Sequence, residues 1–163
     1  MHSATIATPP GPFTIVVDGD GAVIASGWTA DAGDLLALVR PAPAAASIRV
    51  RPELGGVTAA VASYLQGNLA AIDDVPVTQH GGPFIEQAWK VLRTVPAGEP
   101  VTYRELAAMA GRPDAFRAAA SACARNPTAL FVPCHRVVRT GGGLGGFRWG
   151  LPVKQWLLDH ERG

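Results

Sequence analysis

The sequence lacks most of the features that mark secreted or membrane-embedded proteins. Only two of its 163 residues are cysteines, Cys123 and Cys134, which is too few for a secreted disulfide framework, and neither lies in the CxxC spacing of a zinc site. No run of about 18 apolar residues is present to span a membrane. Residues 1–10 lack the basic segment and apolar run of a signal peptide. We therefore expect a cytoplasmic protein with no membrane contact and a free, working thiol.

Charge is unevenly distributed along the chain. Residues before Pro83 include three basic and seven acidic side chains, a net charge of −4, whereas residues 83–163 include eleven basic and six acidic ones, a net charge of +5. Nearly all of this basic excess is arginine, which suits a polyanionic partner such as nucleic acid. Charge alone is equally compatible with a basic soluble surface. A hydrophobic content of 48% is enough to bury a core.

The first half of the sequence, residues 1–80, predicts a small α/β domain with a short sheet. Residues 13–17 and 23–26 flank the turn sequence Asp-Gly-Asp-Gly, a pattern typical of a hairpin. Residues 31–39 and 57–65 carry apolar residues at helical spacing, and residues 47–50 are a candidate strand. No pattern in this half indicates chemistry.

The second half, residues 83–163, is predicted to be mostly helical. One helix is expected over residues 83–94, and a second begins at residue 102 or 103, because Thr102 and Glu105 have the spacing of a capping box. The second helix should end near Gly111, and Asp114 is expected to cap a third helix that ends near residue 125. Two short helices joined by a glycine-containing turn are a candidate helix-turn-helix.

The third of these helices has an apolar face and a polar face. The polar face is suited to approach a groove and present a long cation, but the helix alone favours an ordinary solvated surface. The residues expected in the core are Phe116, Ala119, Ala120 and Cys123, and those of the polar face are Arg117, Ser121 and Arg125, bordered by Ala118 and Ala122.

The most informative segment is residues 131–138, in which Cys134 directly precedes His135. The thiolate is the reactive form of cysteine, and a nearby imidazole can lower a thiol pKa from about 8.5 to below about 7.5. Neighbouring side chains on a strand point to opposite faces, so contact between the two would need a turn or a bridging water. On chemistry alone, a nucleophile and a buried structural cysteine fit this segment equally well.

Over residues 83–161 the sequence resembles the O6-alkylguanine-DNA alkyltransferases. The run Pro-Cys-His-Arg-Val-Val that contains Cys134 is similar to the active-site signature of that family. Arg117, seventeen residues earlier, falls at the family's arginine finger, and Asn126, eight residues earlier, at its hinge. Glu161 ends a final helix similar to the family's own. Residues 8–14 resemble the family's opening strand more loosely.

This resemblance implies a fold and a reaction. The fold would be α+β, a small N-terminal α/β domain followed by a winged helix-turn-helix domain. The reaction would be direct-reversal DNA repair, in which Cys134 takes the alkyl group of O6-alkylguanine irreversibly, once per molecule. His135, oriented by Glu161, would accept the thiol proton through a water. No cofactor or metal is implied.

The same resemblance implies how double-stranded DNA is held through its minor groove. Arg117 would fill the space left by the extruded guanine, and Tyr103 would lie against the flanking phosphate and donate to the base. Asn126 would act as a structural hinge. The protein is expected to act as a monomer that can bind DNA cooperatively. The other residues implied to face DNA are Thr102, Ser121 and Arg125, and those implied to line the pocket are Tyr103, Val137, Phe147 and Arg148.

Two positions depart from the family pattern. Ala120 stands where the family usually has glycine, next to Ser121, and Phe147 stands where tyrosine is common. Because Phe147 has no hydroxyl, the backbone N–H of Arg148 would be the donor to guanine O6. One alternative class remains open at this point: a winged-helix DNA-binding regulator in which Cys134 senses alkylation or oxidation.

Overall fold

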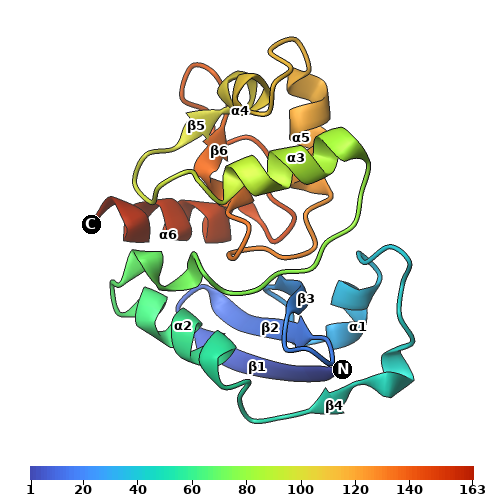
Figure 1. Cartoon of the computed structure of the whole chain (residues 1–163). Helices are drawn as coiled ribbons and strands as arrows, with labels where there is room; N and C mark the ends of the chain where they lie inside the picture. The colour runs from blue at the N-terminus through green and yellow to red at the C-terminus, as the bar shows by residue number, and fades with distance from the viewer. The chain divides into compact units, whose positions relative to one another are not determined.

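The computed structural model describes the whole chain, residues 1–163, as two compact units (Figure 1). The first comprises Met1–His80 and Pro127–Phe131, and the second comprises Gly81–Asn126 and Val132–Gly163. Helices and strands occur in both units, so the α+β class expected from the sequence is confirmed. No helix is both long enough and apolar enough to cross a membrane.

A four-stranded sheet with the order β3-β2-β1-β4 organises the first unit. Strand β2 (Gly11–Val17) pairs antiparallel with β3 (Val23–Gly27), which confirms the predicted hairpin. Strand β1 (His2–Thr8) pairs antiparallel with β2, and β4 (Arg49–Val50) pairs parallel with β1. The sequence did not predict β1, because its small and polar residues have little apolar alternation. Its conformation is fixed by pairing with β2.

Two α-helices and two short 3-10 helices complete this unit. The helices are α1 (Ala32–Leu36), η1 (Ala45–Ser47), α2 (Gly56–Leu65) and η2 (Leu69–Ile72). In Figure 1, α2 runs alongside the sheet. The predicted helix over residues 57–65 is confirmed, whereas the one over residues 31–39 ends at Leu36. The core is formed by side chains from the sheet and both α-helices, among them Phe13, Ile15, Leu35, Val61 and Tyr64.

The second unit is mostly helical, as predicted. Its helices α3, α4 and α5 pack against one another (Figure 1). The indole N–H of Trp89 donates to the Ala122 carbonyl oxygen at 2.9 Å, which ties α3 to α5. The elements are α3 (Pro83–Leu92), β5 (Val101–Thr102), α4 (Tyr103–Met109), α5 (Phe116–Ala124), β6 (Val137–Val138) and α6 (Leu151–Arg162).

The helix starts test two predictions about capping. At α4 the backbone N–H of Glu105 donates to Thr102 Oγ1 at 3.1 Å, and the N–H of Thr102 donates to the Glu105 carboxylate at 3.2 Å, so the predicted capping box is confirmed. At α5 the prediction was wrong: Ala115, not Asp114, is the N-cap, and no side chain caps the helix. The reason is an extra turn, in which Ala115 N–H donates to the Arg112 carbonyl oxygen and delays the helix by one residue.

Candidate active site

Cys134 begins one turn of 3-10 helix, η3 (Cys134–Arg136), and does not lie on a strand. Its N–H donates to the Val132 carbonyl oxygen at 2.8 Å, and the N–H of Arg136 donates to the Pro133 carbonyl oxygen at 3.0 Å. The strand β6 starts only after this turn. The alternation of side chains that a strand would impose on Cys134 and His135 is therefore absent.

The Cys134 side chain is buried, with 7% of the residue exposed. Burial raises the pKa of the thiol, whereas a hydrogen bond from Asn126 and the positive charges of Lys154 and Arg148 act to lower it. Asn126 is itself held in place, because its amide group donates to the Val132 carbonyl oxygen at 2.7 Å. The sequence suggested a lowered thiol pKa. The structure corrects this for the free protein, since burial outweighs the groups that favour the thiolate.

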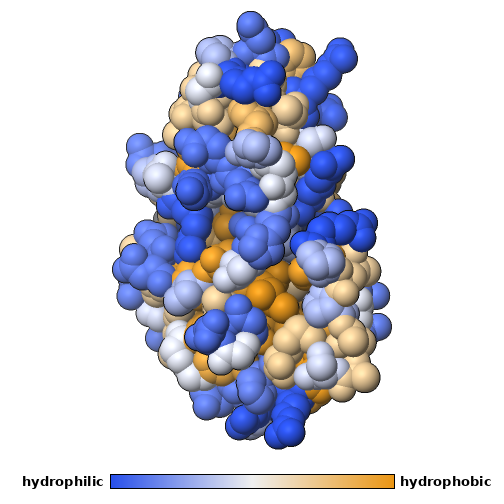
Figure 2. Space-filling model, turned by 45° about the vertical axis from the view of Figure 1, so that its right-hand side comes forward, coloured by the Kyte–Doolittle hydropathy of each residue, from blue (hydrophilic) through white to orange (hydrophobic).

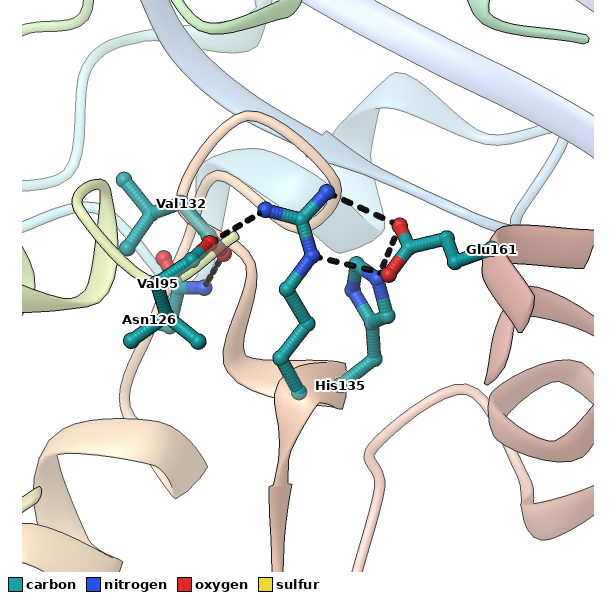
Figure 3. Close-up of polar contacts among 6 residues, drawn as sticks. Val95, Asn126, Val132, His135 and Glu161 are labelled. Atoms are coloured by element: carbon teal, nitrogen blue, oxygen red, sulfur yellow. Dashed lines mark hydrogen bonds and ion pairs between the residues drawn. The ribbon is translucent and has the colours of Figure 1, made fainter. Parts of the chain in front are cut away.

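In the residues after Cys134, two basic side chains are held by one carboxylate, that of Glu161, as Figure 3 shows. His135 Nε2 lies 2.7 Å from Glu161 Oε2. Arg136 donates to both oxygens of the same carboxylate, from Nε to Oε1 at 2.8 Å and from Nη2 to Oε2 at 2.9 Å. Its Nη1 donates to the Val95 carbonyl oxygen at 2.7 Å. All three charged or titratable side chains are buried, so η3 and the end of α6 are joined by a buried polar network.

The network fixes the ionisation states of its members. Burial alone would raise the pKa of Glu161, but hydrogen bonds from His135 and Arg136 and the positive charge of Arg136 hold it well below its usual range. Burial lowers the pKa of His135 and outweighs the opposite effect of Glu161. A neutral imidazole facing an ionised carboxylate carries its proton on Nε2. The other ring nitrogen, Nδ1, is buried and has no hydrogen-bond partner in the protein, so it is available as a proton acceptor.

Lys154 is the least expected residue of this region. It is fully buried, and its ammonium donates to the carbonyl oxygens of Val137 at 2.7 Å and Gly146 at 3.2 Å. Burial lowers its pKa, and the nearby Cys134 and Cys123 thiols raise it. Lys154 therefore ties β6 to the loop of residues 143–150 and brings a positive charge close to the thiol.

That loop and the start of α4 form one wall beside the thiol. Tyr103 is half-buried and hydrogen-bonds to the backbone of Gly146, and both thiols lie close enough to contribute to its raised pKa, of which burial is the main cause. A Cβ atom on Gly145 would lie 2.6 Å from the Tyr103 hydroxyl, so only glycine fits there. Arg148 Nη2 donates to the Ala124 carbonyl oxygen at 2.8 Å, which joins the loop to the end of α5.

The structure confirms the polar face of α5 and corrects its apolar face. Arg117, Ser121 and Arg125 are all exposed. The buried residues, however, are Ala119 and Ala122, whereas Phe116, Ala120 and Cys123 are only half-buried. Contact with α3 draws Ala122 inward, because the Trp89 indole reaches its carbonyl oxygen.

The remaining predicted residues also fall in the second unit. Thr102 caps α4, Val137 is fully buried in β6, and Phe147 is half-buried in the glycine-rich loop. No group of three or more His, Cys, Asp or Glu side chains is placed to hold a metal ion.

Sequence reasoning assigned no role to Arg136 or Lys154. Arg136 lies within the Pro-Cys-His-Arg-Val-Val run, but nothing in that run indicates its ion pair with Glu161. Lys154 could have been found from spacing, since Leu157, Leu158 and Glu161 follow it at helical intervals and share its buried face. A lysine within an apolar helical stripe indicates a buried charge with a specific partner.

Comparisons with known proteins first define the class. Residues 83–163, which contain the whole network around Cys134, match the family model described as "6-O-methylguanine DNA methyltransferase, DNA binding domain". A solved structure of Mycobacterium tuberculosis OGT in complex with DNA is similar over 99% of this chain and 93% of that one, with 30% identity and a TM-score of 0.83.

Full-length relatives then define the family. The methylated-DNA–protein-cysteine methyltransferase of Shigella flexneri is 36% identical over 96% of this chain and 92% of its own length. The human protein of the same name is 41% identical over 73% of this chain and 61% of its own length. The chain belongs to the methylated-DNA–protein-cysteine methyltransferase family. The resemblance found in its motifs is confirmed, and the regulator alternative is not favoured.

Proposed function

We propose that this protein repairs O6-alkylguanine in double-stranded DNA by transferring the alkyl group to Cys134, once per molecule. The observation that carries this proposal is the buried Cys134 thiol next to His135, whose Nε2 is hydrogen-bonded to the ionised carboxylate of Glu161. Family membership supports the same reaction. The site of action would be the cytoplasm, with the protein acting as a monomer that can bind DNA cooperatively.

The thiol loses its proton to His135. Because His135 Nε2 is hydrogen-bonded to Glu161, the free Nδ1 of His135 accepts the Cys134 proton through a bridging water. Proton removal is needed because burial keeps Cys134 in its thiol form. Asn126 and Lys154 then stabilise the thiolate, by a hydrogen bond and by positive charge. The imidazolium that forms is stabilised by Glu161.

The thiolate attacks the alkyl carbon, so that a sulfur–carbon bond forms as the bond between that carbon and guanine O6 breaks. The leaving guanine receives a proton in place of the alkyl group, and Cys134 receives the alkyl group in place of its proton. Tyr103 and the backbone N–H of Arg148 are the proposed donors to the departing base. Val137 and Phe147 complete the pocket. A thioether is not hydrolysed, which limits each molecule to one reaction.

The guanine must leave the base stack before it can reach a buried thiol. Arg117 is proposed to fill the vacated space from the minor groove, and its exposed position on α5 supports this. Thr102, Ser121 and Arg125 would contact the duplex beside it, on a winged helix-turn-helix. Asn126, two residues after the end of α5, would be the hinge between the recognition helix and the active-site turn. The catalytic and DNA-binding roles then belong to residues 83–163, with residues 1–80 as a structural domain.

The test is the intact mass of the protein after incubation with a duplex that contains one O6-methylguanine. We expect a gain of one CH2 unit, located on Cys134 by peptide mapping and absent in Cys134→Ala. No gain in a folded protein that binds the duplex would refute the transfer reaction.

A second measurement tests extrusion separately from chemistry. Arg117→Ala should slow the reaction with the duplex much more than the reaction with the free O6-alkylguanine base, because only the duplex requires base flipping. Arg162→Ala, an exposed arginine near the chain end, is the matched control. Equal losses on duplex and free base would remove the finger role from Arg117.

A further inference from the structure

Helix α4 and the turn between α4 and α5 present two exposed arginines to which the reaction above gives no task, Arg104 and Arg112. The guanidinium carbon of Arg104 lies 4.2 Å from the ring centroid of Phe116, and that of Arg112 lies 5.4 Å from the ring centroid of Phe84. Both distances are within the range of a cation–π contact. The two guanidinium groups, here called the stacked arginine pair, are therefore held at defined places on the helix-turn-helix.

Arg104 of the stacked arginine pair lies close to the proposed finger. The guanidinium carbon of Arg117 is 5.9 Å from the same Phe116 centroid that Arg104 covers. Because both distances are measured from one point, these two carbons are at most about 10 Å apart, the distance over which exposed charges still interact at about 0.1 M salt. The guanidinium groups of Arg104 and Arg117 therefore both lie next to the Phe116 ring, at the N-terminal end of α5.

No carboxylate neutralises these charges. Neither the stacked arginine pair nor Arg117 takes part in an ion pair. Glu105 is in the same helix as Arg104, but its carboxylate is engaged in the capping box. Asp114 lines a surface hollow together with Arg112 and forms no ion pair with it. Like charges left together on a surface are stabilised by a polyanion.

Stacking also leaves the hydrogen-bonding edge of each guanidinium free. A guanidinium that lies over a ring keeps its N–H donors in its own plane, where they can bind a phosphate at two points. Figure 2 shows strongly hydrophilic residues projecting at its upper end, where α4 and α5 lie, around the pale orange of apolar residues. The chemistry of this surface fits the sugar-phosphate backbone.

We propose that Arg104 and Arg112 contact backbone phosphates of the duplex beside the point at which Arg117 enters, with Phe116 and Phe84 fixing their positions. The contact would supply affinity that is independent of sequence and of damage, and would hold the helix-turn-helix in register while the base is extruded. This inference rests on the proposed repair of DNA and deepens it, by naming two residues that set its salt dependence.

The test is the salt dependence of binding to an undamaged duplex, followed by fluorescence anisotropy for the full-length protein. Each phosphate contact contributes about 0.9 to the slope of log K against log salt, so Arg104→Gln and Arg112→Gln should each reduce the slope by about 0.9, and the double variant by about 1.8. At about 0.1 M salt each single change then weakens binding about eightfold. Arg162→Gln removes the same charge from the end of α6 and should leave the slope unchanged.

Two further variants separate charge from placement. Arg104→Lys keeps the charge, so the slope should stay close to that of the unmodified protein. Phe116→Leu keeps every charge but removes the ring, and should weaken binding about two- to fivefold, the size of an exposed cation–π contact. Equal slopes for the unmodified protein, Arg104→Gln and Arg112→Gln would overturn the inference, as would an equal loss of slope in Arg162→Gln.

Failure of this inference is distinct from failure of the proposed function. If the two arginines make no phosphate contact, the slopes stay equal in a protein that still gains the alkyl group on Cys134. If the proposed function is wrong, the unmodified protein gains no mass from damaged DNA.

Discussion

Replacement of Arg136 by methionine is the most informative single change that the structure suggests. The substitution keeps an unbranched side chain in a buried site, but removes the two hydrogen bonds to Glu161 and the one to the Val95 carbonyl oxygen. Glu161 then remains buried with His135 as its partner. The variant therefore isolates the charge of Arg136 from its packing.

The expected loss of stability is large. Removing one partner of a buried, hydrogen-bonded ion pair costs about 3–5 kcal/mol, because the remaining charge has been taken out of water without compensation. For a protein of this size, that corresponds to a fall in Tm of about 6–20 °C. Glu161→Gln should cost a similar amount, since it leaves Arg136 as the uncompensated charge. The double variant contains neither charge and should cost about 2–3 kcal/mol less than the sum of the two.

The change should also alter the chemistry. Arg136 lowers the pKa of His135 and helps to keep Glu161 ionised. Without that positive charge, the His135 pKa rises and the imidazole becomes protonated nearer to neutral pH, where it can no longer accept the Cys134 proton. We expect Arg136→Met to react slowly at neutral pH, with the acid limb of its pH–rate profile displaced to higher pH.

The assay combines urea unfolding of the four proteins in this cycle with single-turnover alkylation by the free base across a range of pH. Costs that add to within about 0.5 kcal/mol would show that the two side chains are not coupled. An unchanged acid limb in folded Arg136→Met would show that Arg136 does not act through His135. Either result would refute the reasoning from the buried network.

Three further outcomes are expected. Burial raises the pKa of Cys134 in the folded protein, so the folded state keeps a proton that the unfolded chain loses above pH of about 8.5. The free energy of unfolding should therefore fall as pH rises beyond that point, and it should fall less steeply in Cys134→Ser. Identical slopes of this free energy against pH in the two proteins would contradict the prediction. Gly98→Ala should destabilise the protein by more than about 1 kcal/mol in thermal unfolding, because Gly98 has a φ of +82° and its new Cβ would lie 3.0 Å from the Glu161 carbonyl oxygen. Gly56→Ala is the control, because the space around Gly56 is open. Thr102→Ala should cost about 0.5–2 kcal/mol in chemical unfolding through loss of the capping box, and an equal cost for Thr102→Ser would show that the hydroxyl is not responsible.

The sequence by itself determined the features that depend on neighbours along the chain. The capping box at Thr102 and Glu105 involves residues three apart, and the hairpin of β2 and β3 involves a four-residue turn sequence between apolar segments. The run around Cys134, with Arg117 and Asn126 at fixed offsets, was sufficient to recognise the family.

Only the tertiary structure decided what depends on residues far apart in the sequence. Arg136 and Glu161 are 25 residues apart, and no local pattern shows that one carboxylate serves both Arg136 and His135. The raised pKa of Cys134 follows from burial by the whole unit, which a Cys-His pair in sequence does not reveal. Strand β1 likewise exists through its pairing with β2. Local geometry follows from short-range sterics and hydrogen bonds, whereas burial and ion pairing are set by contacts that form only when the chain has folded.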